Sequence, residues 1–365
     1  MKKGSSPTSV DVAKQAGVSQ ATVSMVFSGR QERVRVSDAT RTRVLAVAAA
    51  LGYSPHPLAQ ALRRQRSGII GFVPRDQRTT PTMQPVPFLL GLHLARAAMQ
   101  RGYHIIEVGA EENPFVSQVS QVSQVSQETL VSFLQSRRVD GVIFDGPETA
   151  HDVERVFASG VPVVQVIRPQ LTVSTATITV DPAPGINAAV AHLVALGHRA
   201  IAFVGRGGSY PVDTLRLDSF VAALARHALA PDRDALHLVA HYTPDDAYAA
   251  TRALLSRPVR PTAIFAAGDN LVLGVLRALH EARVRVPEAM SVVSYDDVLA
   301  ADLYPPIASV AQPLAEVGER AVALIAALLD PTPSEEEGLR HLVLATRFIA
   351  RASTQPPQSS DGAGG

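Results

Sequence analysis

The chain of 365 residues contains no cysteine, and aromatic residues make up only 5% of it. Without cysteine, disulfides, thiolate metal sites and cysteine nucleophiles are excluded. No apolar run approaches the roughly 18 residues that a membrane-spanning helix needs. Lys2 and Lys3 are not followed by the apolar segment of a secretory signal. These absences predict a soluble, cytoplasmic protein.

Charge is divided unevenly along the chain. Residues 1–66 hold eleven lysines and arginines against three acidic residues, a net charge of +8. The whole chain has 34 basic and 33 acidic side chains, so the remaining residues carry −7. The length suggests two or three domains. A basic N-terminal segment joined to an acidic body is typical of proteins that bind a nucleic-acid duplex.

The stretch 8–27, TSVDVAKQAGVSQATVSMVF, predicts two short helices, 9–16 and 19–27, that meet at Gly17. Gly17 supplies the conformation that a tight turn between helices requires, and Ser19 is placed as the N-cap of the second helix. Each helix has one apolar face, formed by Val12, Ala13 and Ala16 in the first and by Val23, Val26 and Phe27 in the second. The pattern also fits a buried helical hairpin, but the basic charge favours a DNA-binding helix-turn-helix.

The outer face of the second helix carries short or amide side chains that can enter a major groove. Gln20 can bind adenine through two hydrogen bonds, and Ala21 can contact a thymine methyl group. Thr22 and Ser24 are expected to contact phosphate. Met25 either faces the DNA or turns into the core. The residues that the pattern predicts to contact DNA are Thr8, Ser19, Gln20, Ala21, Thr22, Ser24, Met25, Ser37, Thr40 and Leu62.

A third helix is predicted from its N-cap Ser37 to about residue 51, and Gly52 ends it. Its predicted core stripe is Val44, Leu45, Val47 and Ala48. Thr8, Ser37 and Thr40 lie at helix starts, so a capping role explains each of them as well as a phosphate contact does. Residues 58–64 can add a further short helix. Leu62 there either packs on the next domain or inserts at a base step in the minor groove and kinks the duplex.

Two N-terminal segments, DVAKQAGVSQATVS (11–24) and VSDATRTRVLAVAAALGYSPHPLAQALR (36–63), resemble the head and hinge of the lactose-repressor/galactose-repressor family of bacterial transcription regulators. The resemblance continues through GYHIIEVG (102–109), RRVDGVIF (137–144), GVPVV (160–164), HLVALGHRAIAFVG (192–205), RPTAIFAAGDNLVLGVLRAL (260–279), RVPEAMSVVSYDD (285–297) and PPIASVAQP (305–313). It implies a ligand-controlled regulator, most often a repressor, that binds a pseudo-palindromic operator as a homodimer.

Some DNA-contacting positions match the family and others depart from it. Leu62, with Ala59 beside it, matches the family's minor-groove leucine. His56 stands where relatives often have asparagine. Met25 stands where relatives often have an arginine that reads guanine, so we expect a different or weaker base preference there.

The body alternates strand and helix patterns twice over. The first series has strands at 67–73, 102–109, 139–144 and 161–167 and helices at 88–100, 126–136 and 151–159. The second has strands at 176–180, 200–205, 236–240, 263–267 and 291–295 and helices at 185–196, 215–226, 244–256 and 270–281. Alternation with short connections predicts two α/β lobes with parallel doubly wound sheets. A ligand is expected between the lobes, beyond the carboxyl ends of the strands.

The resemblance adds a periplasmic-binding-protein-like architecture, in which segments near 295–350 cross between the lobes. Residues 295–297 then look like a structural signature at this crossover. The full prediction is a small all-α helix-turn-helix head (1–54), a hinge helix or linker (55–66), an effector-binding and dimerisation body of two α/β lobes (67–353) and a disordered tail (354–365).

Six residues are predicted to bind the small molecule. Asp269 follows a strand, where its carboxylate can accept hydrogen bonds from a ligand; it can also serve as a helix N-cap. By resemblance, Arg216 matches an effector-binding arginine, Tyr242 a stacking aromatic and Phe88 a first-lobe aromatic, although Phe88 is equally explained as core. The full set is Phe88, Arg168, Asn187, Arg216, Tyr242 and Asp269.

Two positions argue against a standard hexose effector. Asn187 stands where many sugar-responsive relatives have an arginine, and Ile167 where many have an aspartate. Arg168 either compensates for these changes or lies at the surface.

Other functions fit less well. The sequence GRGG at 205–208 is not the G-x-G-x-x-G of dinucleotide-binding enzymes, so we expect no catalytic residues, cofactor or metal. A solute-binding protein-like sensor without specific DNA binding shares the body but has no use for the basic head. Residues 116–127 repeat Val-Ser-Gln four times, and this segment is interpreted as a low-complexity expansion at the surface.

Overall fold

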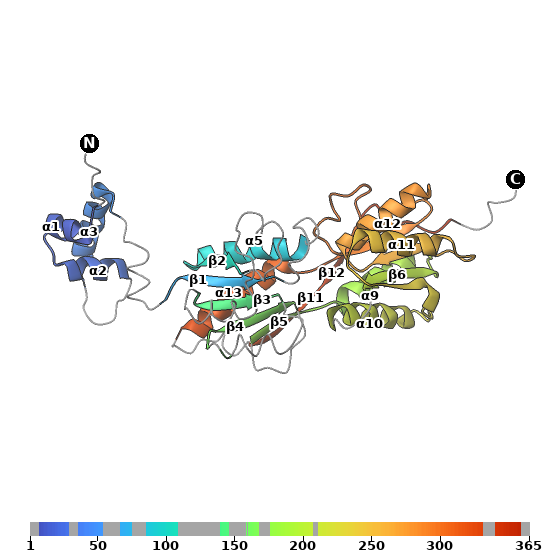
Figure 1. The fold of residues 1–365 in the computed structure, drawn as a ribbon, viewed down its shortest axis with the longest axis horizontal. Coiled ribbons are helices and arrows are strands. Elements are labelled where there is room, and N and C mark those ends of the chain that lie inside the picture. The colour runs from blue at the N-terminus through green and yellow to red at the C-terminus, as the bar shows by residue number, and fades with distance from the viewer. Residues whose placement is uncertain are drawn as a thin grey trace, which may run out of the picture. The chain divides into compact units, whose positions relative to one another are not determined.

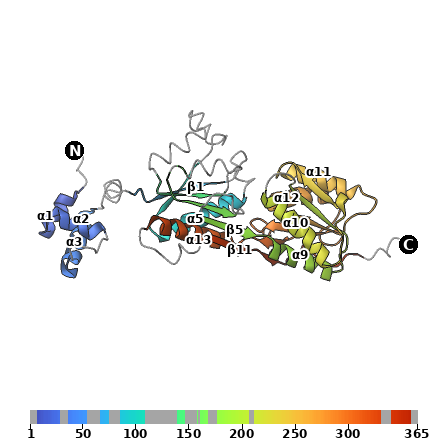
Figure 2. The ribbon, with the colours of Figure 1, turned by 90° about the horizontal axis from the view of Figure 1, so that it is seen from below.

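The computed structural model describes residues 7–28, 36–53, 66–74, 85–108, 139–145, 158, 160–167, 176–206, 211–330 and 340–358. The chain divides into two compact units, Met1–Gly68 and Ile69–Gly365. Figures 1 and 2 show the three-helix head in blue and the two α/β lobes of the second unit. Among the described residues, none of the helices combines the length and hydrophobicity needed to cross a bilayer.

In the first unit the described residues form three helices, α1 (Ser9–Ala16), α2 (Gln20–Ser28) and α3 (Asp38–Leu51). Gly17 ends α1 in the left-handed conformation with φ +63°, as predicted for the turn. All three helices contribute to one small core, made of Val12, Ala13, Ala16, Val23, Val26, Val44 and Ala48. The predicted helix-turn-helix is therefore present.

One predicted core residue of the head is wrong. The Leu45 side chain is 44% exposed, whereas Val44 and Ala48 are buried. Successive helical residues point roughly 100° apart, while residues three and four apart share a face. Leu45 follows Val44 in sequence and therefore leaves the face that packs on α1 and α2.

Lobe 1 is built on a six-stranded parallel sheet in the order β11-β5-β4-β3-β1-β2. Its elements are β1 (Ile69–Val73), α5 (Pro85–Gln100), β2 (His104–Glu107), β3 (Gly141–Phe144), β4 (Val163–Ile167), β5 (Ala176–Asp181), α13 (Leu314–Leu329) and β11 (His341–Ala345). Helices α5 and α13 pack on one face of the sheet. They approach closely because α13 has Gly318 at the contact, where a Cβ atom would lie 2.9 Å from His93 Cβ.

Lobe 2 has a second six-stranded sheet in the order β12-β10-β9-β8-β6-β7, parallel except for β12. Its elements are α9 (Ala183–Ala195), β6 (Ile201–Arg206), α10 (Pro211–Arg226), the 3₁₀ turn Arg233–Ala235, β7 (Leu236–Val239), α11 (Pro244–Leu255), β8 (Ala263–Ala266), α12 (Asp269–Glu281), β9 (Ser291–Asp296), β10 (Ala308–Ala311) and β12 (Arg347–Ile349). Helices α11 and α12 share one core with the sheet, and α9 and α10 share the other (Figure 1). The sheet is therefore doubly wound, as predicted.

The chain crosses between the lobes three times within the described residues: after β5, after β10 and after β11. Thr346, between β11 and β12, lies at the last crossing. Its hydroxyl lies 2.9 Å from the Asp181 carbonyl oxygen and accepts a hydrogen bond from the Gly185 backbone N–H at 3.0 Å. The first and last crossings are thus hydrogen-bonded to each other, and the predicted cross-connection is confirmed.

Most predicted elements of the body are present with shifted ends. The helix predicted from 215 begins at Pro211, a residue favoured in a first helical turn because its missing N–H leaves no donor unpaired there. The predicted helix 126–136, the Val-Ser-Gln repeat and residues 55–65 of the predicted hinge lie outside the described residues, and of the predicted helix 151–159 only residue 158 is described.

The prediction of a disordered tail from residue 354 is wrong at its beginning. The Thr354 hydroxyl lies 2.9 Å from His192 Nε2, and Gln355 is hydrogen-bonded through both its N–H and its carbonyl group to Ser291. The polar composition of the tail predicted disorder, but lobe 2 supplies specific partners for this backbone. Residues 359–365 lie outside the described chain.

Candidate nucleic-acid interface and ligand pocket

A capping box fixes the start of α1. The Thr8 backbone N–H donates to Asp11 Oδ2 at 2.8 Å, its hydroxyl donates to the same oxygen at 2.7 Å, and Thr8 Oγ1 accepts from the Asp11 N–H at 3.4 Å. Hydrogen bonds from Thr8 lower the pKa of the Asp11 carboxyl below its usual value. The capping explanation of Thr8 is confirmed, and its phosphate contact stays a prediction.

Helix α2 begins with a similar arrangement. Ser19 Oγ accepts from the Thr22 N–H at 3.1 Å, which confirms the predicted N-cap. The Gln20 side chain donates through Nε2 to Ser9 Oγ at 3.0 Å, so α1 orients the residue predicted to read a base. Ala21 is exposed beside it, while Thr22, Ser24 and Met25 are half-buried.

The third helix is capped by Ser37. Its Oγ accepts from the Thr40 N–H at 3.3 Å and donates to Thr40 Oγ1 at 2.9 Å. Three predicted DNA-contacting residues, His56, Ala59 and Leu62, lie outside the described residues. The described residues thus present a compact three-helix head in which α1 and α3 end at Gly17 and Gly52, and α1 and α2 have exposed polar residues at their starts.

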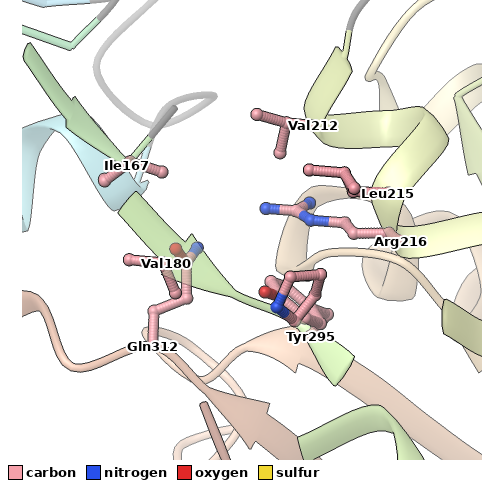
Figure 3. A pocket seen from close by; sticks show the side chains of 8 residues that line it. Ile167, Val180, Val212, Leu215, Arg216, Tyr295 and Gln312 are labelled. Atoms are coloured by element: carbon pink, nitrogen blue, oxygen red, sulfur yellow. The ribbon is translucent and has the colours of Figure 1, made fainter. Parts of the chain in front are cut away.

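A small pocket lies between the two lobes. Figure 3 shows Ile167 and Val180 of lobe 1 on one side and Val212, Leu215 and Arg216 of α10 on the other. Pro182, Tyr295 and Gln312 complete the lining. The pocket lies where the sequence predicted a ligand, at strand ends between the lobes.

Arg216 is the polar centre of this pocket and is only 3% exposed. Its Nη1 donates to the Ala267 carbonyl oxygen at 2.8 Å and to Tyr242 Oη at 3.1 Å, and its Nη2 donates to Asp296 Oδ1 at 3.2 Å. The guanidinium carbon lies 4.0 Å from the centre of the Tyr295 ring. Burial, the largest single effect, would lower the pKa of this guanidinium, but Asp296, Tyr242, Tyr295 and Asp213 together outweigh burial and raise it. Arg216 is therefore a fixed, permanently charged donor.

Of the other predicted effector residues, Tyr242 is placed next to Arg216. Its hydroxyl accepts from Arg216 and donates to the Ala267 carbonyl oxygen. In α9, Asn187 is half-buried, and in α5, Phe88 is 69% exposed, so Phe88 is neither core nor part of the pocket lining. Arg168 lies outside the described residues.

Asp269 does not have the N-cap role that the sequence offered for it, and its ligand contact stays a prediction. It is the first residue of α12 rather than its N-cap, which is Gly268. Its fully buried carboxylate accepts from the Val298 and Leu299 N–H groups at 2.6 and 2.7 Å and from Ser294 Oγ at 2.8 Å. Burial, reinforced by the nearby Asp296 charge, raises the pKa of this carboxyl to about 7. In this structure Asp269 holds the loop after β9.

Several lining residues were not predicted to contact a ligand. Val180, Pro182, Val212 and Leu215 are ordinary apolar residues, and the sequence gives no signal that separates them from core. Gln312 is the second-to-last residue of the PPIASVAQP segment, and Tyr295 belongs to a segment predicted to be structural only. Their positions beside the lobe crossings are the signal that could have identified them.

Comparison with known proteins gives a family match in each of the two units. Residues 9–56 match the profile of bacterial regulatory proteins of the lacI family, and residues 190–354 match a periplasmic binding protein-like domain. The chain is 30% identical to catabolite control protein A of Priestia megaterium over 321 residues, which cover 87% of this chain and 91% of that protein. It is 30% identical to the ribose operon repressor of Escherichia coli (strain K12) over 345 residues, covering 90% and 95%.

The chain belongs to the lacI family of bacterial regulatory proteins. Two solved structures agree with this assignment. The Lac repressor dimer bound to operator and the anti-inducer ONPF is 26% identical, with a TM-score of 0.73 and coverage of 96% of this chain and 100% of that one. The complex of the transcriptional regulator CelR with cellobiose is 29% identical, with a TM-score of 0.66 and coverage of 95% and 99%.

Membership in the lacI family makes the chain a DNA-binding transcription regulator rather than an enzyme. The described head has the helix-turn-helix of that family, and the body has its periplasmic-binding-protein-like lobes.

Proposed function

We propose that this lacI-family regulator is a repressor that binds a pseudo-palindromic operator as a homodimer. Its operator affinity would be controlled by a small molecule, a sugar or a related metabolite, bound between the two lobes. The observation that carries the proposal is the pairing of a basic helix-turn-helix head with two lobes that meet at a pocket around the buried Arg216. Such a pocket lets a ligand change the relative positions of the lobes and so couple two distant sites.

On the DNA side, α2 is the proposed major-groove helix. Gln20 and Ala21 are exposed at its start, where recognition helices contact base edges. Met25 lacks the paired donors with which arginine binds guanine, so we expect little guanine preference at its position. The hinge 55–66 would contribute Leu62 as a minor-groove wedge, with His56 and Ala59 beside it.

On the ligand side, Arg216 and Tyr242 remain the best-supported predictions because they are adjacent and Arg216 lines the pocket. Asp269 would have to exchange its backbone hydrogen bonds for ligand hydroxyls in order to contribute. A sugar is the proposed ligand class because CelR is described with cellobiose and another relative is a ribose operon repressor.

An exposed apolar stripe on α5 supports the homodimer. Phe88, Leu92 and Met99 are 69%, 41% and 70% exposed and recur at helical spacing on one side of this helix. A stripe of this kind is typical of a surface that another chain covers. The Lac repressor structure named above is also a dimer.

The alternative is a solute-binding protein-like sensor that does not bind DNA specifically. An electrophoretic mobility shift assay with a selected palindromic operator and a scrambled duplex distinguishes the two. We expect a shift of the operator alone at moderate salt, reversed or strengthened by the effector. Equal shifts of both duplexes would contradict the repressor function. Because operator DNA lies in the cytoplasm, we propose that the protein acts there, on the nucleoid.

A further inference from the structure

Ile167, at the end of β4, has an unusual backbone conformation in the wall of the pocket. Its φ is +69°, in the left-handed region that β-branched residues rarely occupy. Strain of this kind costs on the order of 1–3 kcal/mol and tends to persist at functional positions. Asparagine or aspartate would tolerate this conformation better. The pocket thus has an apolar side chain at a position where the backbone favours a polar one.

The apolar wall extends beyond Ile167. Val180, from the neighbouring strand β5, lies beside it, and Val212 and Leu215 of α10 lie across the pocket (Figure 3). A ligand between the lobes therefore meets branched aliphatic side chains from both of them. A hydroxyl group placed against this wall would lose its water and gain no partner from these side chains.

The polar groups of the pocket are gathered at Arg216 and Gln312. Arg216 Nε is buried and has no hydrogen-bond partner among the described residues. Gln312 Nε2 donates to Asp296 Oδ1 at 2.6 Å, and because a carboxylate only accepts, this bond fixes the Gln312 amide. Its oxygen is therefore the acceptor that this edge can offer a ligand, and Arg216 Nε–H is a buried donor without a partner among the described residues.

The carboxylates near the pocket are already engaged. Asp296 is bound by Arg216 and Gln312, Asp213 is paired with Arg206 Nε at 2.7 Å, and Asp269 accepts from the 298–299 backbone. Arg216 and Asp296 balance each other, so the described lining does not favour a charged ligand. It favours a neutral ligand with one polar and one apolar edge.

We propose that Ile167 determines ligand specificity in this pocket by selecting a neutral ligand that presents a methyl or other C–H edge to it. Among monosaccharides, that ligand is a 6-deoxyhexose in preference to the parent hexose. The inference rests on the proposed function, namely that the pocket binds a sugar-sized effector. An unpaired hydroxyl against Ile167 would weaken binding about fivefold or more.

The test compares matched sugar pairs on the full-length protein: D-fucose with D-galactose, L-rhamnose with L-mannose, and 6-deoxy-D-glucose with D-glucose. Isothermal titration calorimetry gives Kd for each sugar, and the operator shift is measured in parallel. In the wild type we expect the 6-deoxy member of at least one pair to bind about fivefold or more tightly than its parent. The variant Ile167→Asn should lose or reverse this preference, and Ile167→Val, which keeps a branched apolar side chain, should retain it.

The outcomes distinguish the role of Ile167 from the wider proposal that a sugar is the effector. Sugar binding with no 6-deoxy preference, or an unchanged ratio in Ile167→Asn, overturns the role of Ile167 but leaves a sugar-controlled repressor in place. Operator binding that no sugar alters, together with no measurable heat, overturns the sugar effector itself and the inference with it. Ile167→Asn relieves the positive φ but gives up the burial of a side chain that is 3% exposed. The unfolding temperature of the unliganded variant is therefore measured first, and the Kd values are compared at a temperature where both proteins are folded.

Discussion

Arg216 and Asp296 form a buried ion pair beneath the interlobe pocket, with Nη2 3.2 Å from Oδ1 and each side chain only 4% exposed. The arginine comes from α10 and the aspartate from the end of β9, so the pair joins two elements of lobe 2 at the point where the lobes meet. The same guanidinium contacts Tyr242, Tyr295 and the Ala267 carbonyl group. The pocket's main donor is thus held rigidly before a ligand arrives.

The first prediction concerns this pair. Arg216→Met leaves Asp296 buried without its cation and should destabilise the body by about 3–5 kcal/mol. The double variant Arg216→Met/Asp296→Asn removes both charges and should be more stable than Arg216→Met alone. Urea unfolding followed by circular dichroism measures both. A double variant no more stable than Arg216→Met would contradict the coupling.

The second prediction concerns pH. His198 is 1% exposed, and its Nε2 must donate to the Gln355 carbonyl oxygen at 2.9 Å because that oxygen only accepts. Burial lowers the pKa of this imidazole, partly opposed by Gln355. The folded state thus favours the neutral ring, so stability is fully present above the unfolded pKa near 6.5 and is lost as pH falls below it.

Protonation of His198 should therefore contribute a downward shift of the unfolding temperature between pH 7.5 and pH 5.5, which the Asp269 carboxyl, with its pKa raised to about 7, opposes. In His198→Gln, which cannot take up a proton, this shift should shrink. It should not vanish, because burial also lowers the pKa values of His93, His192 and His237. The same pH dependence in variant and wild type would exclude His198 as a contributor.

The third prediction concerns helix packing in lobe 2. A Cβ atom on Gly274 of α12 would lie 1.9 Å from the Pro244 carbonyl oxygen at the start of α11. Since a backbone atom cannot move aside as a side chain can, Gly274→Ala should destabilise the body by about 3 kcal/mol or more. The matched control is Gly91→Ala in α5, where the nearest atom is Phe72 Cε1 at 3.5 Å.

Gly91→Ala should be neutral or stabilising by up to about 1 kcal/mol, because alanine favours the helix. Thermal midpoints of the two variants provide the comparison. Equal midpoints would show that α11 and α12 are not packed as closely as the structure indicates.

The fourth prediction concerns the hinge. Leu62→Ala should weaken binding to a specific operator far more than binding to a scrambled duplex, because only the kinked operator accommodates the wedge. Titrations of both duplexes at one salt concentration measure the two affinities. Equal losses would remove the wedge hypothesis. Leu58→Ala, on the same short predicted helix, is the matched control.

Local patterns predicted the fold well where one residue type has one physical role. Gly17 has the positive φ that its turn requires, and Ser19 and Ser37 accept the capping hydrogen bonds expected of them. Of the twelve strands in the described residues, nine were predicted, because buried parallel strands are continuous apolar runs. Strands β10, β11 and β12 were not predicted, and β5 was assigned to the second series although it pairs in the lobe 1 sheet. Leu45 was placed wrongly in the core because residues on one face of a helix lie three or four positions apart, whereas Leu45 directly follows the buried Val44.

The site was harder to predict than the fold. Arg216 was found because a family motif marks it, whereas Val180, Val212 and Gln312 become neighbours only through the lobe crossings. Asp269 shows the opposite case: its position after a strand suggested a ligand contact, but the loop at 298–299 supplies its partners. The partners of a side chain depend on which distant segments fold against it, and local sequence does not encode that.

The three crossings between the lobes also constrain the order in which the lobes can fold during synthesis. Lobe 1 takes its last strand, β11, and the helix α13 from residues 314–345, which follow nearly all of lobe 2 in the chain. During synthesis the face of β1, β3, β4 and β5 that α13 covers therefore stays open until the ribosome has almost finished. The head closes on local contacts early, but lobe 1 can be completed only at the end, and a premature stop before residue 314 leaves an aggregation-prone apolar sheet.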